Sequence, residues 1–482
     1  MKAAEPTLVP GQALASFSTL DEPKRKPPLD LTFRPAFLTH QRFRRAVLDS
    51  GESAPMLLAL ERSDGAVTRH TASLFSDGHP LADDNLPYAE RLLKFLLWQR
   101  GAWRVYVAAP DRVARYLQAC YAPDGPRAFD AQFMGEQVYR RPFTLVACSP
   151  SDIPAAHESR QSLGRHLNGC RIGFDLGASD LKVSAVIDGE PVFSQEIEWR
   201  PREQTDPAYH RDHILAALRL AASHLPRLDA IGGSSAGVYL NNRPMVASLF
   251  RGIPPERFDE VRNLFVGLQE EMGVPLAIVN DGEVAALAGS MSLDEDAVMG
   301  IAMGSSQAAG YVTPDGSITD WLNELAFAPV DYSPQAPVDE WSGDRGCGAS
   351  YFSQQAIFRL AASAGLQIPS GLSPARQLEF VQGRLEAGEE AAVRIWQTMG
   401  VYLAHGMAHY AEFYDMRHVL LLGRCTSGAG GPLMLDEARA TLAEESPSLA
   451  SRLQLHLPDE RSRRVGQAIA AASLPDVLET SR

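Results

Sequence analysis

The chain is poor in cysteine. Its five cysteines stand far apart among 482 residues, and no two of them form a C-x-x-C pair: Cys120, Cys148, Cys170, Cys347 and Cys425. An odd number of scattered thiols is typical of a protein kept in a reducing cytoplasm. The same scarcity argues against a zinc cluster built from cysteine pairs.

Long apolar runs and an excess of basic residues are missing as well. No run reaches the roughly 18 apolar residues of a membrane span, and the N-terminal MKAAEPTLVPGQALASF lacks the core of a signal peptide. The 45 Lys and Arg residues face 59 Asp and Glu residues, a net charge of −14. This charge gives no overall attraction to nucleic acid or to anionic membranes. We therefore expect a cytoplasmic protein without a membrane or nucleic-acid partner.

The remaining composition, 45% hydrophobic and 22% charged, is that of a globular protein with two or three domains. Prolines recur through residues 1–38, and no hydrophobic period survives there, which predicts a flexible, solvated tail. Residues 39–165 alternate strand and helix patterns, beginning with a hairpin around the SDG turn at Ser63. This pattern predicts a smaller N-terminal α/β domain, in which we find no chemical motif.

From Cys170 onward the pattern changes to two larger units. Strand pairs open near residues 171 and 298, and helices follow each of them. This order predicts two α/β lobes, over residues 170–295 and 296–482, with the last helix returning to the first lobe.

The first strand pair contains RIGFDLGASDLKV, with a turn of small residues after Phe174. Phosphate binding needs backbone N–H donors and little side-chain bulk, which Gly177 and Ser179 provide. Lys182 adds a positive charge, and Asp175 at the strand end could hold a hydrated Mg²⁺ ion. A second turn of this kind, GSSQAAG, contains Gly304, Ser305 and Ser306. Two such turns facing each other would bind a polyphosphate from both sides.

A further carboxylate stands in VPLAIVNDGEVAALAG, where a buried strand ends and a helix begins. Asp281 in this stretch has two interpretations. It could be a helix N-cap, as Asp and Asn often are. It could also be a general base at the floor of a cleft, taking a proton from a hydroxyl that attacks phosphorus.

The order of these segments over residues 170–475 resembles the actin-like ATPase superfamily, and within it the ROK family of sugar kinases and sugar-responsive repressors. DLGASDLK resembles the first phosphate motif, IVNDGEVAALAG the catalytic segment and VLLLGRCTSGAGGP the adenosine motif. The resemblance implies a two-lobed, ribonuclease H-like α/β fold, with residues 170–295 on the acceptor side and residues 296–482 on the nucleotide side. It implies an ATP- and Mg²⁺-dependent kinase acting on a sugar or sugar derivative.

The resemblance also assigns roles to single residues. Asp281 would be the catalytic base, and Asp175 would hold Mg²⁺ through water. The expected sugar contacts are Asn280, Glu324, Ser235 and Gly237. The expected nucleotide contacts are Asp175, Gly177, Ser179, Lys182, Gly304, Ser305, Ser306, Gly423 and Arg424. A homodimer is one of the assemblies that the sequence allows.

Several positions depart from the family pattern. Phe327 stands where a zinc-binding and sugar-contacting histidine is usual, Ala349 replaces a sugar-binding glutamate, and Cys347 alone remains of a cysteine-rich segment. Arg424 replaces a glycine of the adenosine motif. We therefore expect no family zinc site. The chain is either a kinase with an atypical acceptor pocket or a non-catalytic sugar- or nucleotide-binding regulator.

Three other interpretations are open. Residues 233–237 match G-x-S-x-G, the nucleophile elbow of a serine hydrolase, although VYLNNRP is not a helix start. His405 and His409 have the spacing of two metal ligands on one helix, with two helical histidines at a surface between the lobes as the alternative. GDRGCGASYFS is slightly similar to the dehydratase-activator branch of the superfamily, whose iron–sulfur cluster would need Cys347 from two chains.

Overall fold

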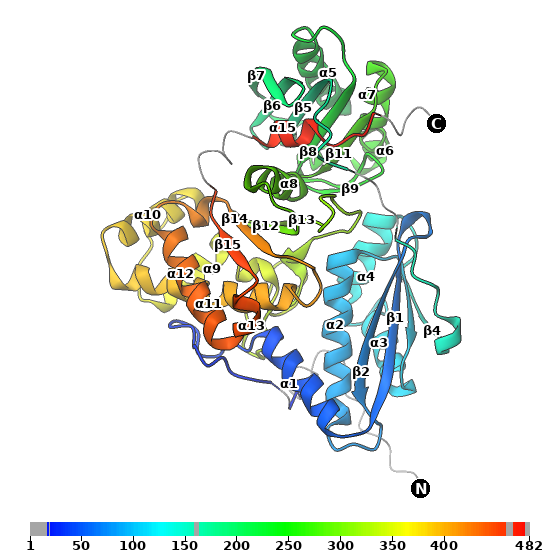
Figure 1. Ribbon diagram of the computed structural model, residues 1–482, viewed down its shortest axis with the longest axis vertical. Coiled ribbons are helices and arrows are strands. Elements are labelled where there is room, and N and C mark those ends of the chain that lie inside the picture. Colours follow the sequence, from blue (N-terminus) through cyan, green and yellow to red (C-terminus); the bar gives the residue numbers. More distant parts are fainter. Residues whose placement is uncertain (1–16, 19, 159–162, 459–465, 478–482) are drawn as a thin grey trace.

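The computed structural model describes residues 17–18, 20–158, 163–458 and 466–477. Three sheets of four or five strands organise these residues, and a two-stranded ribbon accompanies them. Figure 1 shows three bodies: an upper lobe around β5 and β8, a lobe around β12 and β14, and the N-terminal domain beside the latter.

The N-terminal domain is a four-stranded sheet of order β2-β1-β3-β4 covered by helices. The predicted hairpin is present, with the turn at Ser63–Gly65. The strands are β1 (Ser53–Glu61), β2 (Val67–Phe75), β3 (Arg104–Ala108) and β4 (Thr144–Ala147). The helices are α1 (Ala36–Asp49), α2 (Asn85–Arg100), α3 (Asp111–Cys120) and α4 (Ala128–Gln132).

Helix α2 lies between its own sheet and the second lobe (Figure 1). All its residues except Arg100 are buried, including the charged ones. Leu93 and Trp98 belong to one continuous core that also contains Met407 and Tyr410 of the second lobe. The N-terminal domain is therefore packed against the second lobe through a shared core.

Charged residues cross this shared core as a closed network. Asp344, from a loop of the second lobe, accepts hydrogen bonds from Arg91 at 2.8 and 3.1 Å and forms ion pairs with Lys94 at 3.2 Å and Arg127 at 2.8 Å. Two further carboxylates complete the network, Glu90 beside Arg127 and Asp130 beside Lys94. Three cations thus meet three anions. Although burial opposes ionisation of Asp344, Arg91 and Lys94 hold its pKa below the usual value.

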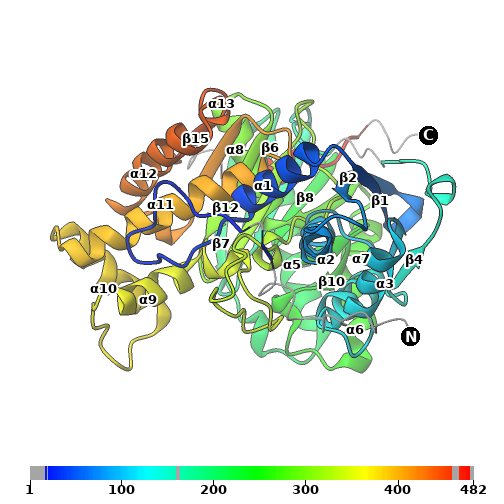
Figure 2. The same ribbon diagram turned by 90° about the horizontal axis from the view of Figure 1, so that it is seen from below.

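The prediction of a flexible tail over residues 1–38 is wrong for residues 20–38. Phe33 is buried against the rings of Tyr351 and Tyr402, and the Leu29 N–H donates to Thr398 Oγ1 at 3.1 Å. Figure 2 shows this segment and α1 along the second lobe. Its prolines do not prevent packing, because the segment forms two turns, closed by hydrogen bonds from the Asp30 and Phe33 N–H groups to the Pro27 and Asp30 carbonyls. Residues 1–16 and 19 lie outside the described part.

The first lobe is built on a five-stranded sheet of order β11-β8-β5-β6-β7, in which β5, β8 and β11 are parallel. The short helix α15 (Gln467–Ala472) packs on β5 and β8. A Cβ added to Gly173 or Gly232 would lie 1.5 or 1.6 Å from a carbonyl oxygen of α15, so only glycine allows this contact. The strands are β5 (Cys170–Leu176), β6 (Asp180–Ile187), β7 (Glu190–Glu198), β8 (Ala230–Ser235) and β11 (Leu276–Asn280), and the other helices are α5 (Pro207–Ala222), α6 (Phe258–Arg262) and α7 (Leu264–Met272).

The second lobe is built on a four-stranded sheet of order β13-β12-β14-β15. Helix α8 (Asp281–Leu293) leaves the first lobe and packs on β12 and β13. A Cβ on Gly310 would lie 2.1 Å from the Gly282 carbonyl oxygen, so backbone meets backbone where α8 begins. The strands are β12 (Val298–Met303), β13 (Gln307–Val312), β14 (His418–Leu422) and β15 (Gln454–His456), and the helices are α9 (Gln354–Ser363), α10 (Pro374–Glu386), α11 (Glu390–Tyr410), α12 (Gly430–Glu445) and α13 (Pro447–Ala450). The ribbon pairs β9 (Val238–Leu240) with β10 (Arg243–Val246).

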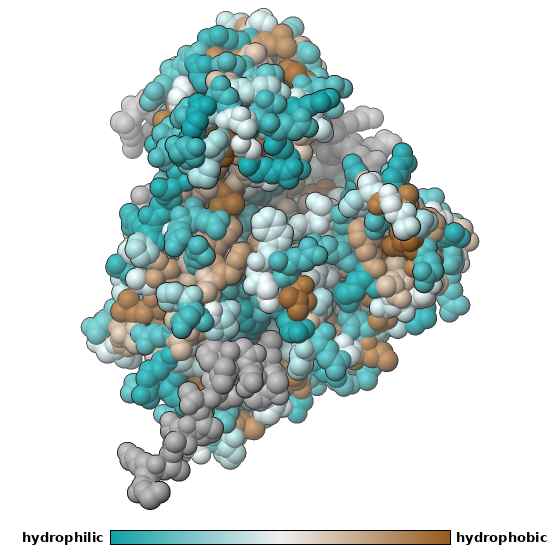
Figure 3. Space-filling model, turned by 180° about the vertical axis from the view of Figure 1, so that it is seen from behind, coloured by the Kyte–Doolittle hydropathy of each residue, from teal (hydrophilic) through white to brown (hydrophobic). Residues whose placement is uncertain are grey.

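The surface seen from behind is largely hydrophilic, with apolar residues in scattered groups (Figure 3). Within the described ranges, no helix combines the length and the apolarity that crossing a membrane requires.

We predict that Asp344→Asn destabilises the protein by about 3–5 kcal/mol, because three buried cations would then face two anions. Urea unfolding followed by tryptophan fluorescence measures the change. The control is Glu379→Gln, in an exposed ion pair with Arg376, where we expect a change below about 1 kcal/mol. Equal effects of the two substitutions would contradict a role of the buried network in stability.

Candidate active site

Polar residues gather where three parallel strands end. In the sheet, Asp175 of β5 lies beside Ser234 of β8. One residue further along β8, Ser235 lies beside Asn280 of β11. The carboxyl ends of parallel strands share one edge of a sheet, where ligands of α/β proteins usually bind. Asp281 follows directly after β11, at the same edge.

Asn280, not Asp281, is the N-cap of α8. Its Oδ1 accepts from the Gly282 N–H at 2.7 Å, and its Nδ2 donates to the Gly237 carbonyl at 2.7 Å. The Asn280 side chain is therefore held by the protein on both sides, and it fixes the loop at Gly237, whose φ is +131°. Asp281 Oδ1 also accepts from the Gly282 N–H, at 3.0 Å. The N-cap alternative thus applies chiefly to the neighbouring residue.

Three carboxyl groups influence one another at this edge. Burial and the nearby Asp175 carboxylate raise the pKa of Asp281 to about 6. Burial and Asp281 in turn raise the pKa of Glu324 to about 7. Burial also raises the pKa of Asp175, against the opposing effects of the Ser234 hydroxyl and Lys182. At neutral pH, Asp281 is therefore mostly ionised, with a basicity suited to accepting a proton.

Buried hydroxyl groups surround these carboxyls. The hydroxyls of Ser235 and Tyr239 are buried, and neither makes a hydrogen bond of good geometry within the described residues. The Tyr239 hydroxyl lies near both Ser235 and Asp281, which influence its pKa. Buried polar atoms without a partner are rare in folded proteins and point to a ligand that would satisfy them. Sequence reasoning missed Tyr239, since a tyrosine in a short strand carries no distinctive pattern.

Glu283, three residues after the N-cap Asn280, supports the segment that carries Glu324. Its carboxyl accepts from Asn323 Nδ2 at 2.5 Å and from the Tyr311 N–H at 3.4 Å. The Asn323 Oδ1 accepts from the Tyr414 hydroxyl at 2.7 Å. Burial raises the pKa of Glu283 to about 8, so it carries its proton at neutral pH. Sequence reasoning did not single out Glu283, because its importance depends on hydrogen bonds with two distant segments, at Tyr311 and at Asn323.

The turn after β5 is open to solvent. Ser179 is exposed, and the Lys182 ammonium lies 3.7 Å from Asp180 and is about half exposed. The Gly177 N–H donates to the Asp180 carbonyl at 2.8 Å, which closes the turn. Ser179 lines a surface cavity of about 720 Å³ together with Arg200 and Arg202.

The second turn and the adenosine motif meet in the other lobe. A Cβ on Gly304 would touch only the Ser306 carbonyl, and Ser305 and Ser306 are exposed. Gly423, at φ +93°, packs against the backbone of Met303. A cavity of about 460 Å³ is lined by Asp281, Ala302, Ala308, Leu420, Leu422 and Gly423.

The structure thus brings Asp281 to the same cavity as Gly423, whereas Ser179 lines a different cavity. Arg424 is exposed, and its side chain has no assigned role in the structure. That the turns at Gly177 and Gly304 bind one polyphosphate stays a prediction.

Phe327, one of the positions that depart from the family pattern, packs against the N-terminal domain, and Cys347 lies beside the ionic network that joins this domain to the second lobe. The ring of Phe327 lies 4.4 Å, between centroids, from Trp98 of α2. Cys347 is buried, with its thiol 4.0 Å from Asp344 Oδ2 in the ionic network. An aromatic contact therefore surrounds Phe327, where the family pattern has histidine. The ion network lies beside Cys347, where the family pattern has a cysteine-rich segment.

Two alternative interpretations are contradicted. Strand β9, not a helix, follows Ser235, so residues 233–237 do not form a nucleophile elbow. His405 and His409 are both buried in α11, but among the described residues they do not belong to a common metal-ligand cluster.

The chain is similar to known proteins in its structure. No protein-family model matches the sequence, and no curated protein matches it. A ROK hexokinase from Thermus thermophilus is similar in structure, with a TM-score of 0.50 at 19% identity, over 65% of this chain and 100% of the hexokinase. The chain contains the two-lobed, actin-like fold of the ROK sugar kinases.

Two further ROK-fold structures are similar over comparable lengths. One is a ROK family transcriptional regulator homologous to the E. coli MLC protein, with a TM-score of 0.49 at 19% identity, over 64% of this chain and 79% of the regulator. The other is a ROK glucokinase from Streptomyces griseus, in complex with glucose and AMPPNP, with a TM-score of 0.46 at 17% identity, over 63% of this chain and 98% of the glucokinase.

We predict that Glu283→Gln flattens the pH dependence of thermal stability. The folded pKa of about 8 lies above the ordinary 4.5. Protonation of Glu283 therefore makes its full contribution to the free energy of unfolding below about pH 4.5. This contribution is lost as the pH rises through about 8. Glutamine imitates the protonated group at every pH. Thermal midpoints measured from about pH 5 to about pH 9 should fall less in this variant than in the wild type, and Glu379→Gln should follow the wild type.

Proposed function

We propose that the chain is an ATP-dependent carbohydrate kinase that transfers the γ-phosphoryl group to a hydroxyl of a sugar or sugar derivative. The observation that carries this proposal is the Asp281 carboxyl, which has a pKa of about 6 and lines a cavity beside Gly423. The similarity of the fold to a ROK hexokinase supports it.

The residues present fit a nucleotide and a magnesium ion. The cavity lined by Asp281 and Gly423 is walled by small and apolar side chains, which suits a flat base or ribose. The open backbone at Gly304 suits a phosphate approached by main-chain groups. Asp175 supplies a single buried carboxylate, which suits Mg²⁺ held largely through water. ATP supplies the transferred phosphoryl group, and Mg²⁺ neutralises the charge of its phosphates.

The chain's own residues would then position the acceptor and take its proton. Asp281 would accept the proton of the attacking hydroxyl, because it is ionised at neutral pH and close to the orphaned hydroxyls of Ser235 and Tyr239. Lys182 and the turn amide at Ser179 would stabilise charge on the phosphates, and Gly177, whose own N–H closes the turn on Asp180, would leave the backbone there without side-chain bulk. Closure of the two lobes would exclude water from the transfer.

The acceptor pocket would be formed by Asn280, Glu324, Ser235 and Gly237. Asn280 contributes mainly by fixing the Gly237 loop, because both ends of its amide are already used. Glu324, half protonated near pH 7, can donate or accept a hydrogen bond to a sugar hydroxyl. Phe327 offers only an apolar contact beside it, which favours an acceptor different from that of the family.

A non-catalytic sugar- or nucleotide-binding regulator is the second candidate. The packing of Phe327 on Trp98 favours it, because this contact joins the acceptor side to the N-terminal domain. In such a protein, sugar binding near Phe327 would change the packing of α2, and no phosphoryl group would be transferred.

We predict that Asp281→Asn lowers the rate of phosphoryl transfer by about 10²–10⁴-fold, because asparagine cannot accept the proton. Binding of a fluorescent ATP analogue should change little. The matched control is Asp259→Asn, at an exposed position on α6, which should keep full turnover. Transfer is measured as ADP release over a panel of sugars. Unchanged turnover in Asp281→Asn would contradict the mechanism, and nucleotide binding without turnover in the wild type would favour the regulator.

We also predict that kcat/KM falls below about pH 6, by about tenfold per pH unit, because protonated Asp281 is not a base. Rates are measured in saturating ATP across the acidic range, after stability at each pH has been verified. A profile that stays flat to about pH 4, the range of an ordinary aspartate, would contradict the raised pKa as a catalytic property.

A further inference from the structure

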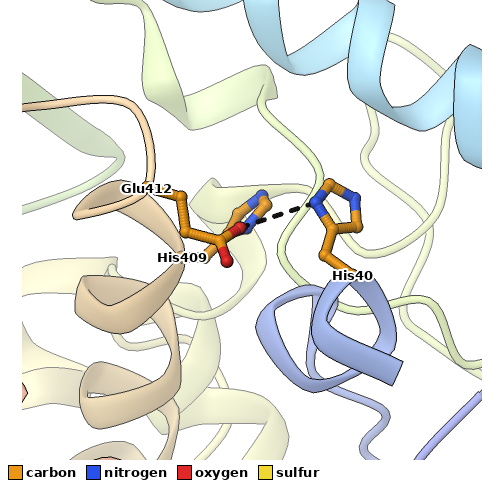
Figure 4. Close-up of side chains that lie close together, drawn as sticks. All are labelled: His40, His409 and Glu412. Atoms are coloured by element: carbon orange, nitrogen blue, oxygen red, sulfur yellow. Dashed lines mark ion pairs between the residues drawn. The ribbon is translucent and has the colours of Figure 1, made fainter. Parts of the chain in front are cut away.

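A cluster of potential metal ligands, none of them assigned to the candidate active site, lies where α1 meets the end of α11. His40 belongs to α1, His409 to the last turn of α11, and Glu412 follows that helix. Figure 4 shows the two imidazole rings turned toward the Glu412 carboxylate. The Nδ1 atoms of both histidines lie 3.6 Å from Glu412 Oε2. One ligand atom from each of the three residues lies within 4.8 Å of the others.

The atoms that face one another are buried without hydrogen bonds. His40 and His409 are 0% and 1% exposed in their side chains, and Glu412 is 14% exposed. Within the described residues, His40 Nδ1, both ring nitrogens of His409 and Glu412 Oε2 have no hydrogen-bond partner. At 3.6 Å, the nitrogen–oxygen separations are too long for hydrogen bonds. Several orphaned polar atoms in one place are costly unless something satisfies them together.

Neighbouring groups orient the ligands. His40 Nε2 lies 2.8 Å from the Tyr332 hydroxyl, which points Nδ1 toward the cluster. This arrangement, with one ring nitrogen held by a second group, is typical of metal-binding histidines. Arg44 pairs with the other oxygen of Glu412, Oε1, and is 44% exposed, so water screens its charge. The rings of Phe95 and Phe413 pack around His409 at 4.7 and 5.3 Å between centroids.

We propose that His40, His409 and Glu412 bind one Zn²⁺ ion that joins α1 to α11. Two imidazoles and a carboxylate are a donor set that zinc accepts, with bonds of about 2.0–2.2 Å. In a tetrahedron with such bonds, neighbouring ligand atoms lie about 3.4 Å apart, close to the observed 3.6 Å. Water completes the fourth position. Imidazole ligands disfavour Mg²⁺ and Ca²⁺, which prefer oxygen.

The role of this ion is structural, because its ligands join two helices and are almost closed to solvent. The site is separate from the Cys347 segment, where the family pattern has its zinc. It also differs from the His405 and His409 pair suggested by their spacing on the helix, since His405 does not contribute.

The test measures zinc in the full-length protein. The protein is stripped with a chelator, incubated with ZnCl₂, and freed of unbound metal before elemental analysis. We expect about one zinc per chain in the wild type, and a loss of about tenfold or more in Glu412→Gln and His409→Gln. His405→Gln, one turn earlier on the same buried helix, is the matched control and should keep its zinc.

Cobalt substitution gives a second measurement that needs no variant. CoCl₂ added to the stripped wild type should give the visible absorption bands of tetrahedral Co²⁺, and ZnCl₂ should remove them. Chelation should lower the thermal midpoint of the wild type and leave that of His409→Gln unchanged. The proposal is overturned if the wild type binds no stoichiometric zinc and gives no cobalt bands. It is equally overturned if folded Glu412→Gln and His409→Gln both keep the metal.

Discussion

The structure depends on the burial of α2 between two units that the chain builds separately. A helix that carries Glu90, Arg91 and Lys94 cannot be buried on all sides unless other charges meet its own. The partner charges are Asp344 of the second lobe, and Asp130 and Arg127 of the N-terminal domain. Neither unit alone satisfies the network. The N-terminal domain is therefore an integral part of the kinase-like body, and its position is set by charge as well as by apolar packing.

The same constraint shapes the surroundings of the candidate site. The Phe327 ring packs at a tilt against Trp98, and Cys347 is buried beside Asp344, which pairs with Arg91 and Lys94 of α2, so the N-terminal domain fixes the surroundings of both residues. At the strand ends, burial raises the pKa values of Asp175, Asp281 and Glu324, and the Asp175 carboxylate adds to the shift of Asp281 as Asp281 adds to that of Glu324. The fold thus places carboxyl groups with raised pKa values together at the strand ends, whereas the buried charges around α2 are paired. Groups with shifted pKa values are common at functional sites.

Local patterns predicted the parts of the structure that are decided locally. The hairpin around Ser63 and the strand end at Asp281 follow from periodicity and turn residues. The segment around Phe33 was predicted as a flexible tail because its packing on α11 is invisible in its own composition. His40 could not be connected with His409, since they lie far apart in the chain and each looks like an ordinary core residue. Likewise Tyr239 gains its meaning only from the neighbouring Ser235 and Asp281.

The contact between α15 and the first sheet has a consequence for biosynthesis. Gly173 and Gly232 are synthesised well before the backbone that covers them, at Ala468 and Ala471. Until then one face of β5 and β8 lacks its cover, so the first lobe has to wait while the second lobe is translated. During this interval an exposed patch of strand would be a natural target for chaperones, and its closure would report that the polypeptide has been synthesised through α15.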